Sequence, residues 1–95
     1  MDYKIKENSK IAAIAALLMK ASQMAMVVGK TIYLHNTSRE EFLGDTRWLR
    51  HEMVHLRQFE KYGLLRFLLL YTWESIRKGY YNNKYEIEAR KGETL

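Results

Sequence analysis

The 95-residue sequence contains no cysteine and no proline. The absence of cysteine excludes disulfide scaffolds, cysteine-based zinc fingers and thiol nucleophiles. The absence of proline, together with only five glycines, favours long helices and few sharp turns. The 16 lysines and arginines are spread along the whole chain, and no long block of like charges occurs. The net charge of +5 therefore indicates a basic, solvated surface, and we expect no nucleic acid as a partner.

A long hydrophobic run is also missing. Residues 11–28 are mostly apolar, but Lys20 divides them into two pieces that are each too short to span a bilayer. No small-residue cleavage site of the Ala-x-Ala kind follows them, which argues against a signal peptide. We therefore expect an amphipathic or buried helix here, no membrane-spanning segment, and a cytoplasmic location by default. The polar residues 1–8 are expected to be frayed.

The composition that remains is that of an ordinary globular protein, with 47% hydrophobic and 28% charged residues. The length suits one domain, residues 1–95, rather than two. A chain of this size buries roughly 60–70% of the surface that its unfolded form exposes, so its core is small. A bound metal would stabilise such a fold, because its ligands tie distant elements together.

Local signals predict a mainly α-helical fold with a small β element. Asn8 or Ser9 can cap a first helix, Ser38 forms a capping box with Glu41, and Asp45 can cap the helix that follows. We expect about three long helices, one short strand or hairpin and a short C-terminal helix. The expected positions are about 9–27, 46–61 and 64–78 for the long helices, 31–35 for the strand, with an extension back to 26–28 left open, and about 84–91 for the last helix.

Two further expectations concern packing. The helix at residues 64–78 is very apolar over most of its length, so we expect it to be mostly buried. Trp48 and Trp73 are expected in the core. At the polar end of the same helix, Glu74 and Lys78 are four residues apart and can form an ion pair.

Residues 51–55 read His-Glu-Met-Val-His and fall within the second expected long helix. On a helix, side chains four residues apart lie one above the other, so His51 and His55 can bind one metal ion. Glu52 lies about 100° round the helix axis from His51, where it can accept a proton from a water on the metal. This is the spacing of the His-Glu-x-x-His motif of zinc peptidases. Gln58 shares the face of the two histidines and can contact the surroundings of the metal or the substrate.

A catalytic zinc site has three protein ligands and one open position, so a third ligand is needed. His35 is the only other histidine, but it lies upstream on the expected strand, where a histidine is more often a surface residue or a substrate contact. Glu60 faces away from the histidines on their own helix. Glu74 already has Lys78 as a partner, and Glu93 lies in a stretch that we expect to be frayed.

Two glutamates remain as candidates for the third ligand, Glu86 and Glu88. They are two residues apart, hence about 200° apart round a helix, so only one of them can face the metal. Glu86 shares its side with Ala89, whose small side chain would let this helix approach the motif helix closely. We therefore predict Glu86 as the third ligand, with Glu88 as the alternative.

With these residues in place, the sequence resembles the gluzincin metallopeptidases, and most closely the minimal single-domain members called minigluzincins. The resemblance rests on His51-Glu52-x-x-His55, followed downstream by Glu86-x-x-Ala89. It implies a zincin-like minimal domain that hydrolyses peptide bonds of a peptide or protein substrate. It also implies that the two histidines and Glu86 bind one Zn²⁺, and that Glu52 is the general base for the attacking water.

The resemblance, which spans the strand, the motif helix, the connecting helix and the glutamate helix, also implies where a substrate lies. The strand Thr31–His35 would be the edge along which an extended peptide pairs main chain to main chain, with Tyr33 and His35 as contacts. The developing oxyanion needs a further hydrogen-bond donor. Tyr80, Tyr81 and His35 are the candidates, and we favour Tyr81.

Two departures from the pattern of the family bear on activity. Many gluzincins carry an acidic residue four positions after the glutamate, where it orients a zinc-bound histidine, and here that position is Arg90. Only nine residues follow Glu86, too few to build the far wall of a cleft. We therefore expect an open site, or one that a partner protein or an oligomer completes. The alternative function is a small zinc-binding or interaction protein that is not catalytic or depends on a partner.

Overall fold

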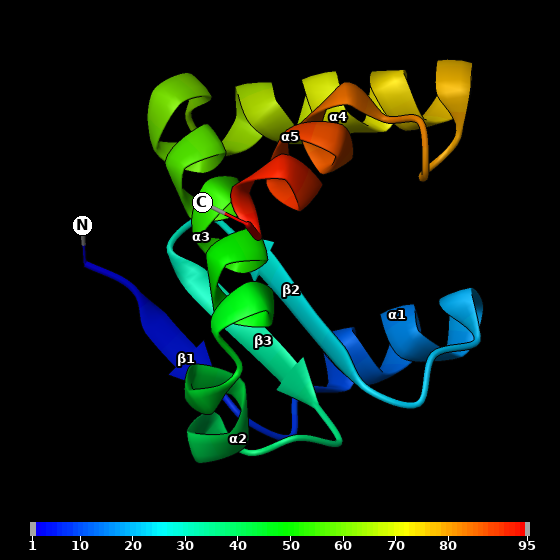
Figure 1. Ribbon diagram of the computed structural model, residues 1–95. Helices are drawn as coiled ribbons and strands as arrows, with labels where there is room; N and C mark the ends of the chain where they lie inside the picture. The colour runs from blue at the N-terminus through cyan, green and yellow to red at the C-terminus, as the bar shows by residue number, and fades with distance from the viewer. Residues whose placement is uncertain (1, 95) are drawn as a thin grey trace.

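A three-stranded sheet and five helices form the structure, a computed structural model that describes residues 2–94 (Figure 1). The fold is mainly α-helical with a small β element, which confirms the predicted class. In chain order the elements are β1 (Lys4–Lys6), α1 (Lys10–Met19), β2 (Met24–Val28), β3 (Thr31–His35), α2 (Arg39–Gly44), α3 (Thr46–Tyr62), α4 (Leu64–Lys78) and α5 (Lys84–Gly92).

The sheet has the strand order β1-β3-β2, so β3 lies in the middle. β2 and β3 form an antiparallel hairpin in which Val28 is paired with Thr31. The turn between them uses Gly29 at φ 65°, a left-handed conformation that costs glycine little. β1 joins the other side of β3 in parallel, with Lys4 opposite Thr31. β2 is therefore an edge strand of the sheet.

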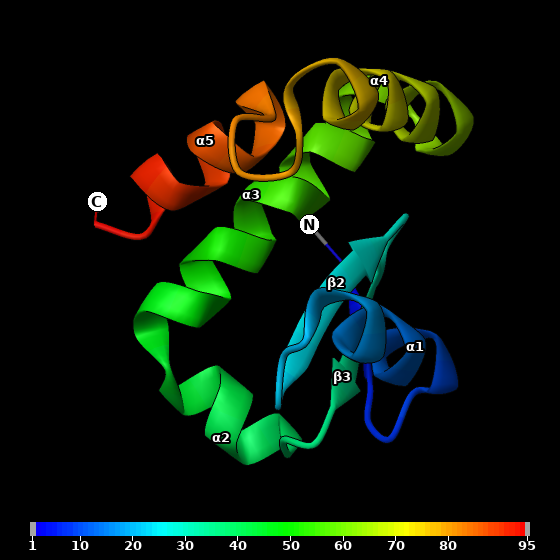
Figure 2. The same ribbon diagram turned by 90° about the vertical axis from the view of Figure 1, so that its right-hand side faces the viewer.

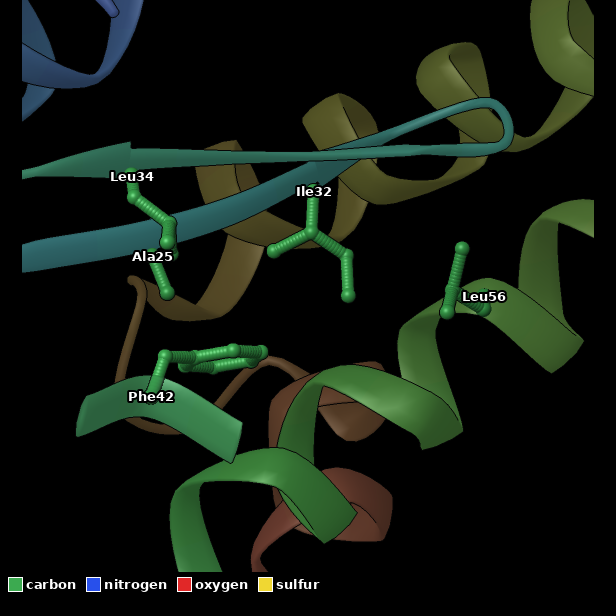
Figure 3. Close-up of a cluster of buried hydrophobic side chains, with 5 residues drawn as sticks. All are labelled: Ala25, Ile32, Leu34, Phe42 and Leu56. Atoms are coloured by element: carbon green, nitrogen blue, oxygen red, sulfur yellow. The ribbon is translucent and has the colours of Figure 1, made fainter. Parts of the chain in front are cut away.

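One face of the sheet forms the main core with α2 and α3. Side chains alternate between the two faces of a strand, and on β3 the alternate residues Ile32 and Leu34 are fully buried. Figure 3 shows these two side chains and Ala25 of β2 pointing toward Phe42 of α2 and Leu56 of α3. The same alternation places the other β3 side chains on the opposite face.

That opposite face is covered by α1, as Figure 2 shows. The contact is made through Ala12 and Ala16, which are the buried residues of the helix. Their small side chains let α1 lie close to β2 and β3. The sheet therefore separates α1 from α3, and any side chain of β3 that faces α1 faces away from α3.

Side-chain caps begin the helices at the predicted places. The side chains of Ser9, Ser38 and Asp45 each accept a hydrogen bond from the backbone N–H three residues further on. Each cap satisfies a donor that would otherwise lack a partner in the first helical turn. α3, α4 and α5 span the predicted residues to within one position at either end.

The N-terminal third differs from the prediction. The first helix ends at Met19 and not near Val27, because Lys20 adopts a left-handed conformation at φ 55° and its N–H bonds back to the last turn. The following apolar residues form β2, where pairing with β3 outweighs their local helix preference. The expectation that residues 1–8 are frayed is also wrong, since Lys4–Lys6 form β1.

α4 has the predicted bounds but not the predicted burial. Phe67 and Glu74 are its only buried residues, because the helix packs through one narrow face against a cluster that includes Phe59 and Tyr85. Trp73, which we expected in the core, is 60% exposed. Trp48 does pack against the core cluster, as predicted. No helix in residues 2–94 combines the length and the apolar character needed to cross a bilayer.

The buried Glu74 does not form the predicted ion pair with Lys78. Its Oε1 lies 3.9 Å from Nη1 of Arg77, and its Oε2 accepts a hydrogen bond from the backbone N–H of Lys84 at 3.3 Å. The side chain turns inward because its partner is a main-chain donor at the start of α5. Glu74 thus ties the end of α4 to the beginning of α5.

Small residues allow α5 to pack closely on α3. Ala89 and Gly92 are buried, and a Cβ atom at Gly92 would lie 2.5 Å from Cγ2 of Val54. We therefore expect Gly92→Ala to lower the free energy of unfolding by about 1–3 kcal/mol, because either α5 or the stiff Val54 side chain must move. Urea unfolding followed by circular dichroism measures the effect. The matched control is Gly44→Ala, where an added Cβ meets no atom within 4 Å. Equal destabilisation by the two substitutions would contradict the expectation.

Candidate metal centre

The structure brings His51, His55 and Glu86 together, and we call these three residues the ligand cluster. α3 presents both histidines on one face, with ring centroids 5.1 Å apart. α5 supplies Glu86, whose Oε1 lies 3.2 Å from Nε2 of His51 and 3.2 Å from Nε2 of His55. One ligand atom from each residue lies within 4.8 Å of the others. The cluster can therefore hold a single metal ion.

Glu88, the alternative third ligand, lies outside the ligand cluster. Its side chain is exposed, and its Oε1 accepts a hydrogen bond from Nε2 of Gln58 at 2.6 Å. Glu86, by contrast, is 4% exposed and faces α3. The two residues point to different sides of α5, as their spacing requires, and Glu86 is the one beside the histidines.

Each histidine is oriented through its other ring nitrogen. Nδ1 of His51 lies 2.8 Å from Oε2 of Glu93, and Nδ1 of His55 lies 2.8 Å from Oε1 of Gln58. Both acceptors require the hydrogen to be on Nδ1, which leaves Nε2 as the nitrogen that can coordinate a metal. Gln58 is itself held, since its Nε2 donates to the carbonyl oxygen of Tyr85 at 3.1 Å. Gln58 thus contacts a member of the ligand cluster, and its predicted contact with the metal's surroundings or the substrate stays a prediction.

Glu93 is an acidic partner of His51 that the sequence analysis did not identify. We expected this region to be frayed, and that expectation is wrong for Glu93, because its carboxylate contacts both His51 and Nη2 of Arg47, the latter at 3.3 Å. Arg90, at the position where an acid was expected, turns away. Its guanidinium donates to the carbonyl oxygen of Tyr81 and lies 4.2 Å from the centroid of that ring.

Tyr71 of α4 is a member of the site that sequence reasoning missed. Its hydroxyl donates a hydrogen bond of 2.5 Å to Oε2 of Glu86. Glu86 is thus held on one oxygen by Tyr71 and faces the histidines with the other. The available signal was a tyrosine directly after the apolar run Phe67–Leu70, because a buried tyrosine hydroxyl usually needs a polar partner. That signal does not say which partner.

Hydrogen bonding and charge hold the ligand cluster together. Burial alone would raise the pKa of Glu86, but hydrogen bonds from His51, His55 and Tyr71 outweigh it and hold that pKa well below its ordinary range. Burial alone would lower the pKa of each histidine, but the carboxylate of Glu86 outweighs it, and the pKa of both is raised. An anionic carboxylate that faces two imidazole nitrogens is a donor set suited to zinc.

Glu52 adds a second carboxyl group next to the ligand cluster without belonging to it. It is 4% exposed. Burial raises its pKa to about 8, with a further contribution from the negative charges of Glu86 and Glu93. Its carboxyl group can therefore hold or release a proton near neutral pH. The position of Glu52 outside the ligand cluster agrees with its offset round the helix, while its role stays a prediction.

A cavity of about 330 Å³ opens beside the ligand cluster. Its walls are mostly apolar and include Met26 of β2, Phe67 of α4 and Met19 of α1, while Glu52 and Tyr80 add polar groups. Burial raises the pKa of Tyr80 above its ordinary value, so the hydroxyl keeps its proton at neutral pH. A larger cavity of about 670 Å³ between α3 and α5 contains no member of the ligand cluster.

Three predicted substrate or catalytic residues lie elsewhere. β3 is the central strand and not an edge, so the expectation that a peptide pairs along Thr31–His35 is wrong. Tyr33 and His35 project to the α1 side of the sheet, away from α3. Tyr81 is 70% exposed and does not line the 330 Å³ cavity, whereas Tyr80 does. The structure thus places Tyr80 at the site in place of Tyr81, and β2 as the edge strand beside it.

In comparisons with known proteins, no family model, no curated protein and no solved structure matched the chain. The resemblance to the gluzincins, drawn from the residues around His51 and Glu86, stays a prediction. The function is therefore inferred from the geometry and chemistry of the residues described above.

Asn83 positions the helix that carries Glu86, which leads to a prediction about stability. It is fully buried, its side chain accepts from the N–H of Tyr85, and it donates to the carbonyl oxygen of Tyr71 and to Oγ of Ser75. We expect Asn83→Ala to lower the free energy of unfolding by about 2–4 kcal/mol, because a helix cap is lost and two partly buried acceptors lose their donor. Chemical unfolding measures this. The neighbouring Asn82 is exposed, so Asn82→Ala is the control and should change stability little.

Proposed function

We propose that the protein is a zinc-dependent peptidase of the gluzincin kind, in which the ligand cluster holds one Zn²⁺. The observation that carries the proposal is the convergence of three ligand atoms within 4.8 Å, next to an apolar cavity and the buried Glu52. Two imidazoles and one carboxylate suit a catalytic zinc site, which keeps one coordination position open. When bound there, zinc would act as a Lewis acid toward a carbonyl group and lower the pKa of water.

In this proposal Glu52 moves the proton. Its carboxyl group lines the same cavity as both histidines. We assign it to accept a proton from the attacking water at a carboxylate oxygen, and to deliver that proton to the amine nitrogen of the leaving peptide. Tyr80 lines the cavity too, and its hydroxyl would donate a hydrogen bond to the carbonyl oxygen as negative charge develops there.

β2 supports an extended peptide as the substrate. Among residues 2–94, β2 pairs only with β3, so its other edge has main-chain groups free to pair. Met24–Val28 also line the cavity beside the ligand cluster. A peptide added to this edge would pair main chain to main chain and lie next to the ligand cluster. The apolar walls, with Met26 and Phe67, would favour apolar substrate side chains.

The rival proposal is a zinc-binding protein without turnover. The observation that favours it is the complete hydrogen bonding behind the ligands, by Glu93, Gln58 and Tyr71, which suits a structural site as well. Metal content does not separate the two proposals, because both bind zinc. Peptide cleavage does, and Glu52 is the residue on which they differ.

The ligand assignment predicts the zinc content of purified variants. Wild-type protein should hold close to one zinc per chain, and His51→Ala, His55→Ala and Glu86→Ala should each lose most of it, because two ligands are too few for a stable site. Glu93→Gln should weaken zinc affinity by about tenfold, since it removes a carboxylate behind a ligand. His35→Ala is the control and should keep the metal. Unchanged zinc in His51→Ala would show the assignment to be wrong.

The proton-transfer role predicts the activity of Glu52→Gln. This variant should keep its zinc but cleave a broad peptide library at least about 100-fold more slowly than the wild type, because the carboxylate that accepts the proton is gone. Glu60→Gln removes the same charge from an exposed position of α3 and is the matched control. Cleavage by Glu52→Gln at the wild-type rate would contradict the proposed role of Glu52. A zinc-loaded wild type that cleaves nothing would favour the rival proposal.

A further inference from the structure

α1 has its large apolar side chains on the outside. The buried residues of the helix are the small Ala12 and Ala16, whereas Leu17 and Leu18 are 78% and 77% exposed. Ile14 is 60% exposed as well. A helix that serves only to cover a sheet places its large apolar residues inward. The outward face of α1 therefore has another use.

α4 also has large apolar side chains on its outer face. Its inner face includes the buried carboxylate of Glu74, while Leu65, Leu69 and Ile76 are 72%, 64% and 72% exposed. Trp73 is exposed beside them. Most of the exposed large hydrophobic residues of the described chain lie on α1 and α4, and Leu43 is the main one on another helix. Many exposed large apolar side chains on two helices are typical of a site of protein or membrane interaction.

The charges on these two helices all have one sign at the surface. Every exposed charged residue of α1 and α4 is basic, and Lys20, which follows α1, adds another; those within the helices are Lys10, Arg66, Arg77 and Lys78. Glu74 is the one acidic residue of the two helices and is buried. Arg77 lies 3.9 Å from the buried Glu74, and Lys78 shares the side of Glu74. Lys10 and Arg66, each seven residues before an exposed apolar residue, Leu17 and Trp73, therefore supply the positive charge of the outward faces.

Both helices border the mouth of the cavity that holds the ligand cluster. The cavity is lined by Ala15 and Met19 from α1 and by Leu68 and Tyr71 from α4. In Figure 2, α4 lies above β2 and α1 lies beside it, both toward the right of the view. We call the two outward faces together the docking face.

We propose that the docking face binds the surface of an anionic lipid bilayer. The leucines and Trp73 would enter the interface between headgroups and acyl chains, and the lysines and arginines would contact anionic headgroups. A second copy of the chain fits less well, because it would bring two sets of positive charge together with no exposed acid on either helix to pair with them. The proposal does not rest on bound metal or on peptidase activity.

Cosedimentation with vesicles tests the proposal on the full chain. We expect binding to phosphatidylcholine vesicles that contain about 30% phosphatidylserine, and at least about tenfold weaker binding to phosphatidylcholine alone. Binding to the anionic vesicles should also weaken as salt is raised, because the charges involved are exposed. Equal binding to both vesicle types, or binding to neither, would overturn the proposal.

Matched variants separate the docking face from the rest of the surface. Leu17→Gln with Leu65→Gln should reduce binding to the anionic vesicles by about tenfold or more, since two exposed apolar side chains are lost. Leu43→Gln, on α2, should bind like the wild type. All three positions are exposed, so circular dichroism and the melting temperature should show unchanged folding. Wild-type binding by the double variant would contradict the proposal.

Two double variants with the same change in net charge test whether the positive charges of the docking face contribute to vesicle binding. Lys10→Gln with Arg66→Gln removes one charge from each outward face and should weaken binding by about tenfold. Arg57→Gln with Lys91→Gln removes two exposed charges from α3 and α5 and should have a smaller effect. Equal effects of the two pairs would show that net charge alone attracts the protein. A dimer in solution that Leu17→Gln with Leu65→Gln dissociates, without vesicle binding by the wild type, would assign the docking face to a second copy.

Discussion

The site depends on one carboxylate, that of Glu86, placed between two imidazoles from another helix. Burying a carboxylate is costly unless it is paired and hydrogen-bonded. Here the pairing comes from α3 through Nε2 of His51 and His55, and a further hydrogen bond comes from Tyr71 of α4. The position of α5 therefore decides whether the charge of Glu86 is compensated. Ala89, Gly92 and the cap at the start of α5 all act on that position.

Two helices, α4 and α1, contribute both to the site and to the outer surface of the protein. On its inner side α4 carries Tyr71, whose hydroxyl donates a hydrogen bond to Glu86, and on its outer side it exposes Trp73 and several leucines. α1 does the same with small residues inside and large ones outside. The cavity therefore lies between two helices that also face outward, and the expectation of an open site stays a prediction.

Local rules predicted the parts that depend on near neighbours. The spacing of His51 and His55, the caps of the helices and the bounds of α3 to α5 follow from residues within a few positions of one another. Tyr71 contacts Glu86, 15 positions away, and Glu93 contacts His51, 42 positions away. Helical periodicity cannot predict such contacts, because it relates only residues within a few turns of one helix. For the same reason β2 was expected only as an extension left open over residues 26–28, since its pairing with β3 decides its conformation. The exposure of Trp73 was not predicted, because the apolar composition of a helix does not show which of its faces packs against the rest of the protein.

The middle position of β3 also constrains how the chain can assemble. β2 and β3 are joined by a two-residue turn, so their pairing closes a very short loop. β1 must pair with the far side of β3 across the whole of α1 and β2, which costs more chain entropy. Contacts between near neighbours in sequence form faster than distant ones. The topology therefore favours a sheet that grows outward from its centre, with the N-terminal strand added last to a hairpin that already exists.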